Sequence, residues 1–362
     1  MDKHEELNET FDSDETSEVV SNKVGKKRLG VAVGVALVVA AVVSLSIGIG
    51  TRMGSSSSRR QPSASSGAGS LRGESLPPSP SPVSETLTET LTVAPTTPRC
   101  PMRTPPPPLP GKKGVCLRLQ DDLTSSAAWT VNVPLLESLN PSWNYSWGLD
   151  RIQAQPSNVT WLPMAWGAWQ LDALERKLQE SVKSSDSMVL GFNEPDQAEQ
   201  SNMEVSHALA AWPHLEALDK PLVSPSAAKP LGQWMQKFMD QADAKCLRID
   251  WIGVHWYGNP NFEAFRSQMI AVHQRYGNRP LLLTEFAVAD WQATTTAENR
   301  FSTEQVLAFA RQAIPWLEET EWIAGYAWFP FEITLAQGTS SALWDESGTL
   351  TALGRYYASV GV

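Results

Sequence analysis

The sequence predicts an α/β protein whose core is a (β/α)8 TIM barrel. Between residues 114 and 362, short apolar runs typical of buried strands alternate with amphipathic stretches typical of helices. This alternation indicates a parallel sheet, and about eight strands in about 250 residues match the size of a (β/α)8 barrel. A doubly wound open sheet is the alternative, but no glycine-rich phosphate-binding turn follows the first apolar run. We therefore expect one barrel domain, preceded by a single transmembrane helix and a disordered stalk.

The first 113 residues divide into three segments that do not fit a barrel. Residues 1–28 are polar and acidic, which is typical of a disordered tail. Residues 29–50, from Leu29 to Gly50, carry no charge and are long enough to cross a bilayer core of roughly 30 Å. Because a basic cluster precedes them, we expect a type II signal anchor with the barrel extracellular or lumenal. A cleaved signal peptide, and so a secreted barrel, is the alternative. Residues 51–113 are rich in Ser, Thr and Pro, which predicts a disordered linker or stalk.

The helices of the barrel are expected between the apolar runs. Residues 169–182 have leucines at helical spacing. Ser302 and Gln305 form a capping-box pattern that opens a helix over residues 303–314, and Pro315 is expected to end or kink it.

The composition excludes several classes of protein. The formal net charge is −10, so nucleic acid is not an expected partner, because such binding needs a basic face. Three cysteines are too few for a disulfide scaffold and form no closely spaced pair for a zinc site. The sequence leaves the pairing of Cys100, Cys116 and Cys246 open. All 15 tryptophans lie between Trp129 and Trp344, within the expected barrel.

Two glutamates stand at the ends of predicted strands. Glu194 follows the fourth apolar run, and Glu285 lies at the end of the seventh. The carboxyl ends of barrel strands form the mouth where chemistry occurs. Two carboxyl groups at one mouth suit glycoside hydrolysis: a protonated one donates to the leaving oxygen, while an ionised one attacks the anomeric carbon or activates water. Taken alone, Glu194 also fits a helix start and Glu285 a structural ion pair, but their joint placement favours catalysis.

The sixth predicted strand adds two polar side chains. His255 and Tyr257 share one strand face, whereas Trp256 takes the other. If the shared face points into the mouth, both groups can orient Glu285; a hydrogen-bonded core histidine is the alternative. Aromatic side chains gather near the same strand ends, where flat rings can stack on sugars and indole N–H groups can bond hydroxyls. The aromatic residues expected to bind sugar are Trp143, Tyr145, Trp147, Trp166, Trp291 and Trp328.

Seven motifs together resemble glycoside hydrolase family 128, a family of clan A barrels that act on β-1,3-glucans. In chain order they are WNYSWG, LPMAWG, GFNEPDQAEQSNM, LVSPSAA, GVHWYG, LLTEFAVADW and AWF, within residues 114–362. The resemblance implies that Glu194 is the acid/base and Glu285 the nucleophile. It also implies that Asn193 holds the sugar 2-hydroxyl and that the strand-six pair, His255 and Tyr257, lies near the nucleophile.

These observations predict a membrane-anchored, retaining endo-β-1,3-glucanase that needs no metal or cofactor. Its expected partner is β-1,3-glucan or a related polysaccharide. A retaining mechanism requires carboxyl groups about 5–5.5 Å apart, and a separation beyond about 7 Å would count against it. A non-hydrolytic glucan-binding wall protein and a glucan transglycosylase are the alternatives. The sequence leaves open the exact linkage, the chain length bound, endo or exo cutting, cleavage of the anchor, and the oligomeric state.

Two Asn-X-Ser/Thr motifs lie in the expected barrel. Asn144 is inside an aromatic motif, where a glycan would obstruct the cleft. Asn158 lies in an expected turn, so it is the better candidate for N-glycosylation.

Overall fold

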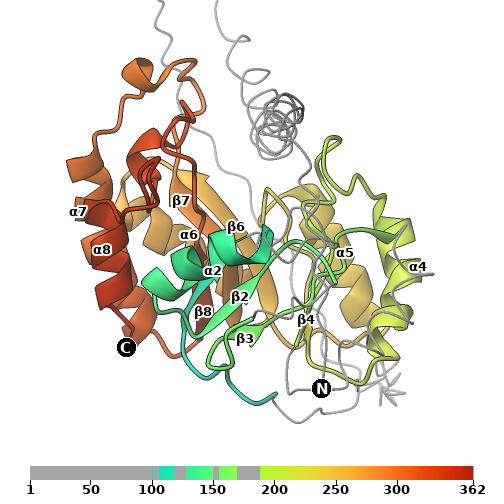
Figure 1. Ribbon diagram of the computed structural model, residues 1–362. Coiled ribbons are helices and arrows are strands. Elements are labelled where there is room, and N and C mark those ends of the chain that lie inside the picture. Colours follow the sequence, from blue (N-terminus) through green and yellow to red (C-terminus); the bar gives the residue numbers. More distant parts are fainter. Residues whose placement is uncertain (1–99, 101–105, 118–127, 150–154, 169–187, 362) are drawn as a thin grey trace, which may run out of the picture.

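The computed structural model describes residue 100 and residues 106–117, 128–149, 155–168 and 188–361 (Figure 1). The expected tail, membrane anchor, most of the stalk and the helix expected over residues 169–182 lie outside these ranges. Within the described ranges, no helix combines the length and the apolar character needed to cross a membrane.

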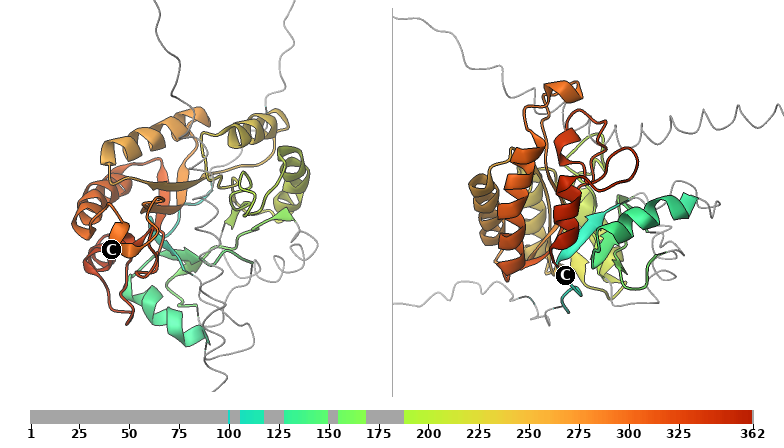
Figure 2. Two further views of the ribbon diagram at one scale, coloured as in Figure 1. Left: turned by 90° about the horizontal axis from the view of Figure 1, so that it is seen from above. Right: turned by 60° about the vertical axis from the view of Figure 1, so that its left-hand side comes forward.

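Parallel strands form a barrel-like ring at the centre of an α/β fold (Figure 2). Six strands pair in the order β3-β2-β1-β8-β7-β6, and β4 pairs with β5. Parallel bridges between Met164 and Leu190 and between Val223 and Trp251 connect the two groups. The strands are β1 (Lys113–Cys116), β2 (Trp143–Tyr145), β3 (Thr160–Trp161), β4 (Val189–Leu190), β5 (Leu222–Val223), β6 (Ile252–Gly258), β7 (Leu281–Val288) and β8 (Ile323–Trp328).

The described helices lie around the outside of the strands (Figures 1 and 2). Two short 3-10 turns interrupt the long loops that follow β7 and β8. The helices and turns are α2 (Ala128–Ser138), α4 (Val205–Glu216), α5 (Gln233–Ala244), α6 (Phe262–Arg275), η4 (Thr296–Glu298), α7 (Thr303–Glu319), η5 (Thr339–Ser341) and α8 (Ala352–Ser359).

The start of α7 agrees with the sequence, but its end does not. Ser302 and Gln305 form the expected capping box. The helix then continues through Pro315 as far as Glu319. Its buried stripe extends past the proline to Leu317, so burial of this face outweighs the one backbone hydrogen bond that proline removes.

Two adjacent lysines fasten the start of β1 to the last two helices. Lys113, expected at the end of the stalk, is instead the first residue of β1 and is fully buried. Its Nζ donates to the backbone oxygens of residues 357, 358 and 360 at the end of α8 (3.3, 3.2 and 2.5 Å). Lys112 Nζ donates in the same way at the end of α7, to the backbone oxygens of residues 317, 318 and 320. Each cation therefore satisfies carbonyl groups that a helix end leaves unpaired.

The cysteine pairing that the sequence left open is settled by a disulfide between Cys100 and Cys246. Cys246 lies in the loop before β6, at the amino-terminal end of the strands. The bond therefore attaches the chain that leads into the barrel to the end opposite the mouth. Cys116 is a buried free thiol, and burial raises its pKa well above the ordinary value.

Candidate active site

A turn, not a helix, positions Glu194 just after β4. Its backbone lies in the left-handed region (φ 40°), which costs a non-glycine residue about 1–2 kcal/mol. Two backbone hydrogen bonds hold this conformation: Glu194 N donates to Ser226 O (2.9 Å) and Gln197 N donates to Glu194 O (3.0 Å). The next helix, α4, begins only at Val205. Strain of this kind is often found where a side chain must be aimed at a reacting group.

Glu285 lies on β7 inside a cage of hydrogen-bond donors. Like Glu194, it is only 2 % exposed. Tyr145 OH (3.0 Å) and Trp147 Nε1 (2.8 Å) donate to Oε1, and Tyr257 OH donates to Oε2 (2.5 Å). Hydrogen bonds to carboxylate oxygens are charge-assisted and stabilise the ionised form. The described side chains that bond to Glu285 therefore supply both of its oxygens with donors.

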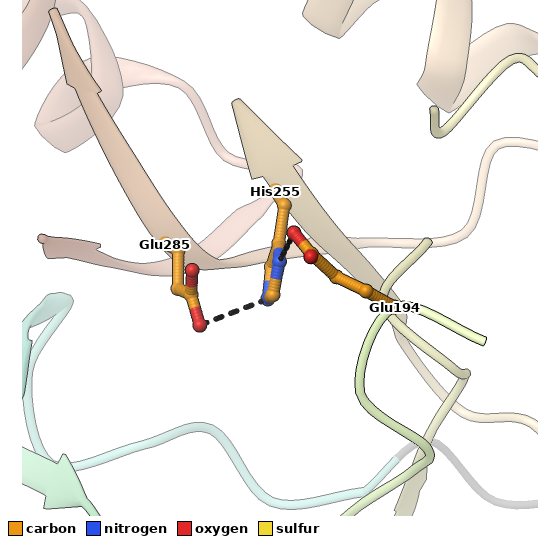
Figure 3. Close-up of side chains that lie close together, drawn as sticks. All are labelled: Glu194, His255 and Glu285. Atoms are coloured by element: carbon orange, nitrogen blue, oxygen red, sulfur yellow. Dashed lines mark hydrogen bonds and ion pairs between the residues drawn. The ribbon is translucent and has the colours of Figure 1, made fainter. Parts of the chain in front are cut away.

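His255 lies between the two glutamates (Figure 3). Its Nδ1 lies 2.9 Å from Glu194 Oε1, and its Nε2 lies 3.4 Å from Glu285 Oε1. A register shift between Val254 and His255 brings this residue level with Glu285 on the neighbouring strand. The nearest oxygens of the two carboxyl groups lie within 4.8 Å of each other. Trp256, on the other face of β6, stacks on helix α7, so the alternation expected from the sequence places His255 in the mouth.

Burial and charge act in opposite directions on these groups. Burial raises the pKa of Glu194, and the hydrogen bond and charge of His255 offset this only in part. Burial lowers the pKa of His255, but the charge of Glu285 and the hydrogen bond to Glu194 outweigh it, so the pKa is raised. Burial, followed by the charge of Glu285, raises the pKa of Tyr145 and of Tyr257 well above the ordinary value. The site thus makes Glu194 a weaker acid than an ordinary glutamate and keeps both tyrosines as donors.

Several buried polar atoms at this centre have no hydrogen-bond partner in the described part of the chain. They are Asn193 Oδ1, Glu194 Oε2 and His255 Nε2, although the last lies near Glu285. Asn193 Nδ2 donates to Gln200 Oε1 (3.1 Å), a partner that the sequence did not single out although it lies in the same motif. Unpaired buried polar atoms are costly, so a group of them at one point indicates a place for a polar ligand.

Aromatic rings surround the two carboxyl groups as expected, but they are not all equivalent. Trp147 and Trp291 are partly buried, and the ring centre of Phe329 lies 6.0 Å from that of Trp147. Tyr257 contacts Phe329 and Trp291, each with ring centres 5.5 Å apart. Trp166 is partly buried, and its carbonyl accepts from the Asn193 N–H (3.0 Å). A recess of about 420 Å³ continues from Trp147 along Phe329.

Two of the predicted sugar-binding aromatics are core residues instead. Trp143 is fully buried, and its Nε1 donates to Lys112 O (3.0 Å) at the amino-terminal end of β2, away from the mouth. Trp328 is also fully buried; its Nε1 donates to Ser341 O (3.0 Å), and its ring packs on Phe286 with ring centres 4.9 Å apart. The prediction was wrong for these two because nearness to a strand end in sequence did not reveal which end of β2 or which face of β8 the side chain occupies.

One group of described residues is arranged so that it could hold a metal ion. The ligand atoms of Glu194, His255 and Glu285 all lie within 4.8 Å of one another. The hydrogen bonds among these residues and the donors around Glu285 already account for their arrangement.

Known proteins share this fold. The profile of the family described as "Glycosyl hydrolase catalytic core" matches residues 126–357. A crystal structure of a subgroup I GH128 endo-β-1,3-glucanase from Amycolatopsis mediterranei, in complex with laminaritriose and laminaribiose, is 30 % identical with a TM-score of 0.58. The match covers 69 % of this chain and 99 % of that one. The chain belongs to glycoside hydrolase family 128.

Membership of family 128 confirms the resemblance expected from the seven motifs. A subgroup II family 128 endo-β-1,3-glucanase from Sorangium cellulosum is 26 % identical over 68 % of this chain and 98 % of that one, with a TM-score of 0.55. Alkali-sensitive linkage protein 1 of Schizosaccharomyces pombe is 30 % identical over 229 residues, which are 60 % of this chain and 40 % of that protein. This chain therefore spans less than half the length of that curated relative. As a family 128 member, it carries a glycoside hydrolase catalytic core.

Proposed function

We propose that this family 128 chain is a retaining endo-β-1,3-glucanase, with Glu194 as acid/base and Glu285 as nucleophile. The observation that carries the proposal is the separation of the two carboxyl groups, whose nearest oxygens lie within 4.8 Å of each other. Retaining enzymes have carboxyl groups about 5–5.5 Å apart, whereas inverting enzymes need about 6.5–9.5 Å to admit a water. The solved relatives that hold laminaritriose, laminaribiose or laminarihexaose support β-1,3-glucan as the substrate.

In the first step, a carboxylate oxygen of Glu285 attacks the anomeric carbon, and the bond from that carbon to the glycosidic oxygen breaks. The proton of Glu194 passes to this oxygen, so the reducing-end fragment leaves as an alcohol. Glu194 Oε1 is held by His255, which leaves Oε2 without a partner in the described structure and free to carry the proton.

In the second step, Glu194 is a carboxylate and acts as the base. It takes a proton from water, whose oxygen attacks the anomeric carbon and displaces Glu285. If a sugar hydroxyl replaces this water, the same residues carry out transglycosylation. Tyr145, Trp147 and Tyr257 hold Glu285 in place through both steps, because they donate to both of its oxygens.

The first experiment is release of reducing ends from laminarin. Wild type is expected to release them, Glu285→Gln to abolish release, and Glu194→Gln to lower the rate by about 10²–10⁴-fold, the usual contribution of a general acid. Wild-type activity equal to that of Glu285→Gln, with both proteins still binding laminarin, would refute hydrolysis and leave the glucan-binding protein. Product lengths from defined laminari-oligosaccharides separate hydrolysis from transglycosylation.

Rescue by azide separates the two glutamates. With an aryl laminaribioside, Glu194→Ala plus azide is expected to form the β-glycosyl azide, because azide attacks the enzyme-bound sugar. Glu285→Ala plus azide is expected to form the α-glycosyl azide, because azide then attacks the substrate directly. The opposite assignment of products would reverse the two roles.

The placement of the enzyme is part of the same proposal. The closed ring of strands supports a complete (β/α)8 barrel. The charge-free segment at residues 29–50 supports a membrane anchor that carries this barrel outside the cytosol. The Cys100–Cys246 disulfide supports an oxidising compartment, where such bonds persist. Membrane fractionation and added protease test this. An extracellular barrel should be digested on intact cells, and a lumenal barrel should be protected in sealed microsomes until detergent is added. Digestion of the barrel in sealed microsomes without detergent would contradict the proposal.

A further inference from the structure

The loop between β7 and α7 is closed by an ion pair between a buried aspartate and an exposed arginine. The Asp290 side chain is 1 % exposed, whereas that of Arg300 is 54 % exposed. Asp290 Oδ2 accepts from the backbone N (2.8 Å) and Nε (2.9 Å) of Arg300, and Oδ1 accepts from Nη2 (2.6 Å). The Gln292 N–H adds a fourth bond (3.2 Å). One carboxylate thus ties together two points of the loop that are ten residues apart.

The closed loop is also fastened to the neighbouring loop between β8 and α8. Asp290 N donates to Gln337 O (2.8 Å), and Gln337 Nε2 donates back to Ala293 O (2.9 Å). Asn299 Nδ2 donates to Ala336 O (2.8 Å). The loop is therefore held both across its own base and along its side, which leaves little freedom for the residues directly after Asp290.

Trp291 is the residue that this arrangement holds. Its indole packs edge-on against Tyr257, with ring centres 5.5 Å apart, and reaches Phe331 at 6.3 Å. Tyr257 in turn donates to Glu285 Oε2. Contacts therefore run without a break from Arg300 through Asp290 and Trp291 to the proposed nucleophile.

We propose that Arg300 and Asp290 are positioning residues that hold Trp291 beside the catalytic centre as an aromatic platform for a glucosyl ring. The inference rests on the proposed function, since it assumes that Trp291 contacts glucan. The Arg300 guanidinium lies over the Phe301 ring, 5.5 Å from the ring centre, and presents a planar fork that pairs with the buried carboxylate of Asp290. Without that fork, the Asp290 charge is buried with fewer donors, and the loop must open to hydrate it.

The test is a double-mutant cycle on laminarihexaose with Arg300→Met, Trp291→Ala and the combined variant. Arg300→Met is expected to raise KM by about two- to tenfold, the range for one weakened aromatic contact, with little change in kcat. The KM of Arg300→Lys should lie between that of Arg300→Met and that of wild type, because an ammonium cannot form two parallel bonds. Arg275→Met is the matched control: it breaks a two-bond pair with Asp240 on helices away from this loop and should leave KM unchanged.

In the combined variant, KM is expected to equal that of Trp291→Ala, because Arg300 acts through Trp291. Independent, multiplying effects of the two substitutions would overturn the proposal, and so would a KM of Arg300→Met equal to wild type. All variants are compared well below their unfolding temperatures, so a loss of stability does not imitate the effect. If wild type binds laminarihexaose without cleaving it, the hydrolytic function fails, and the same cycle is measured on Kd by calorimetry. Absence of both binding and cleavage refutes both proposals.

Discussion

Removal of the Cys100–Cys246 disulfide is expected to lower the stability of the barrel by several kcal/mol. The bond joins residues that are 146 positions apart in the chain. In the chain-entropy account, closing a loop of this length removes about 5 kcal/mol of conformational entropy from the unfolded state at 25 °C. For a domain of about 250 residues, each kcal/mol shifts Tm by about 2–4 °C, so Tm should fall by about 10–20 °C.

The assay is thermal unfolding of Cys246→Ser and of the double variant Cys100→Ser/Cys246→Ser, with and without reductant. The Tm of both variants should fall by the same amount, because each lacks the same bond. Reductant should change the Tm of wild type only. Denatured, unreduced wild type should show one reactive thiol, that of Cys116. A fall in Tm below about 2 °C, or three reactive thiols before reduction, would refute the reasoning.

Three further predictions concern single side chains. His255→Leu removes the hydrogen bond and charge that lower the pKa of Glu194, so the basic limb of kcat/KM, where the acid loses its proton, should move to higher pH; a move to lower pH contradicts this. Lys113→Met leaves backbone oxygens at the end of α8 without their donor and should lower the free energy of unfolding by about 2–3 kcal/mol in urea titrations. An unchanged urea midpoint of unfolding would contradict this expectation. Protein secreted from a eukaryotic host should carry an N-glycan at Asn158, which is exposed at the amino-terminal end of β3, and not at Asn144, which is fully buried. Asn158→Gln should then abolish the mass shift on enzymatic deglycosylation, whereas loss of the shift in Asn144→Gln would contradict the assignment.

The sequence was sufficient for the residues whose place follows from strand periodicity. Glu194 follows β4 and Glu285 lies in the second half of β7, and parallel strands bring their carboxyl ends to one mouth. The two-residue repeat likewise separated His255 and Tyr257 from Trp256.

Features that depend on long-range packing could not be read in the same way. Trp143 and Trp328 stand in aromatic motifs, but their indole N–H groups satisfy backbone oxygens of distant segments. The disulfide depends on where the linker meets the barrel, which no local pattern encodes. Pro315 is a helix breaker by propensity, yet the apolar stripe of α7 overrides it.

The hydrogen bonds from Lys113 to the end of α8 limit how early during synthesis the fold can be completed. Lys113 and Val360 are 247 residues apart, and β1 also needs β8 as one of its two neighbours. Contacts between distant parts of a chain form late, and the ribosome adds about 5–20 residues per second, so β1 waits roughly 10–50 s for its partners. Throughout that interval the lysine is hydrated and the apolar strand beside it is uncovered. β1, the first strand of the described residues, is thus among the last to be secured, which makes the newly synthesised chain, not the finished enzyme, the state most exposed to aggregation.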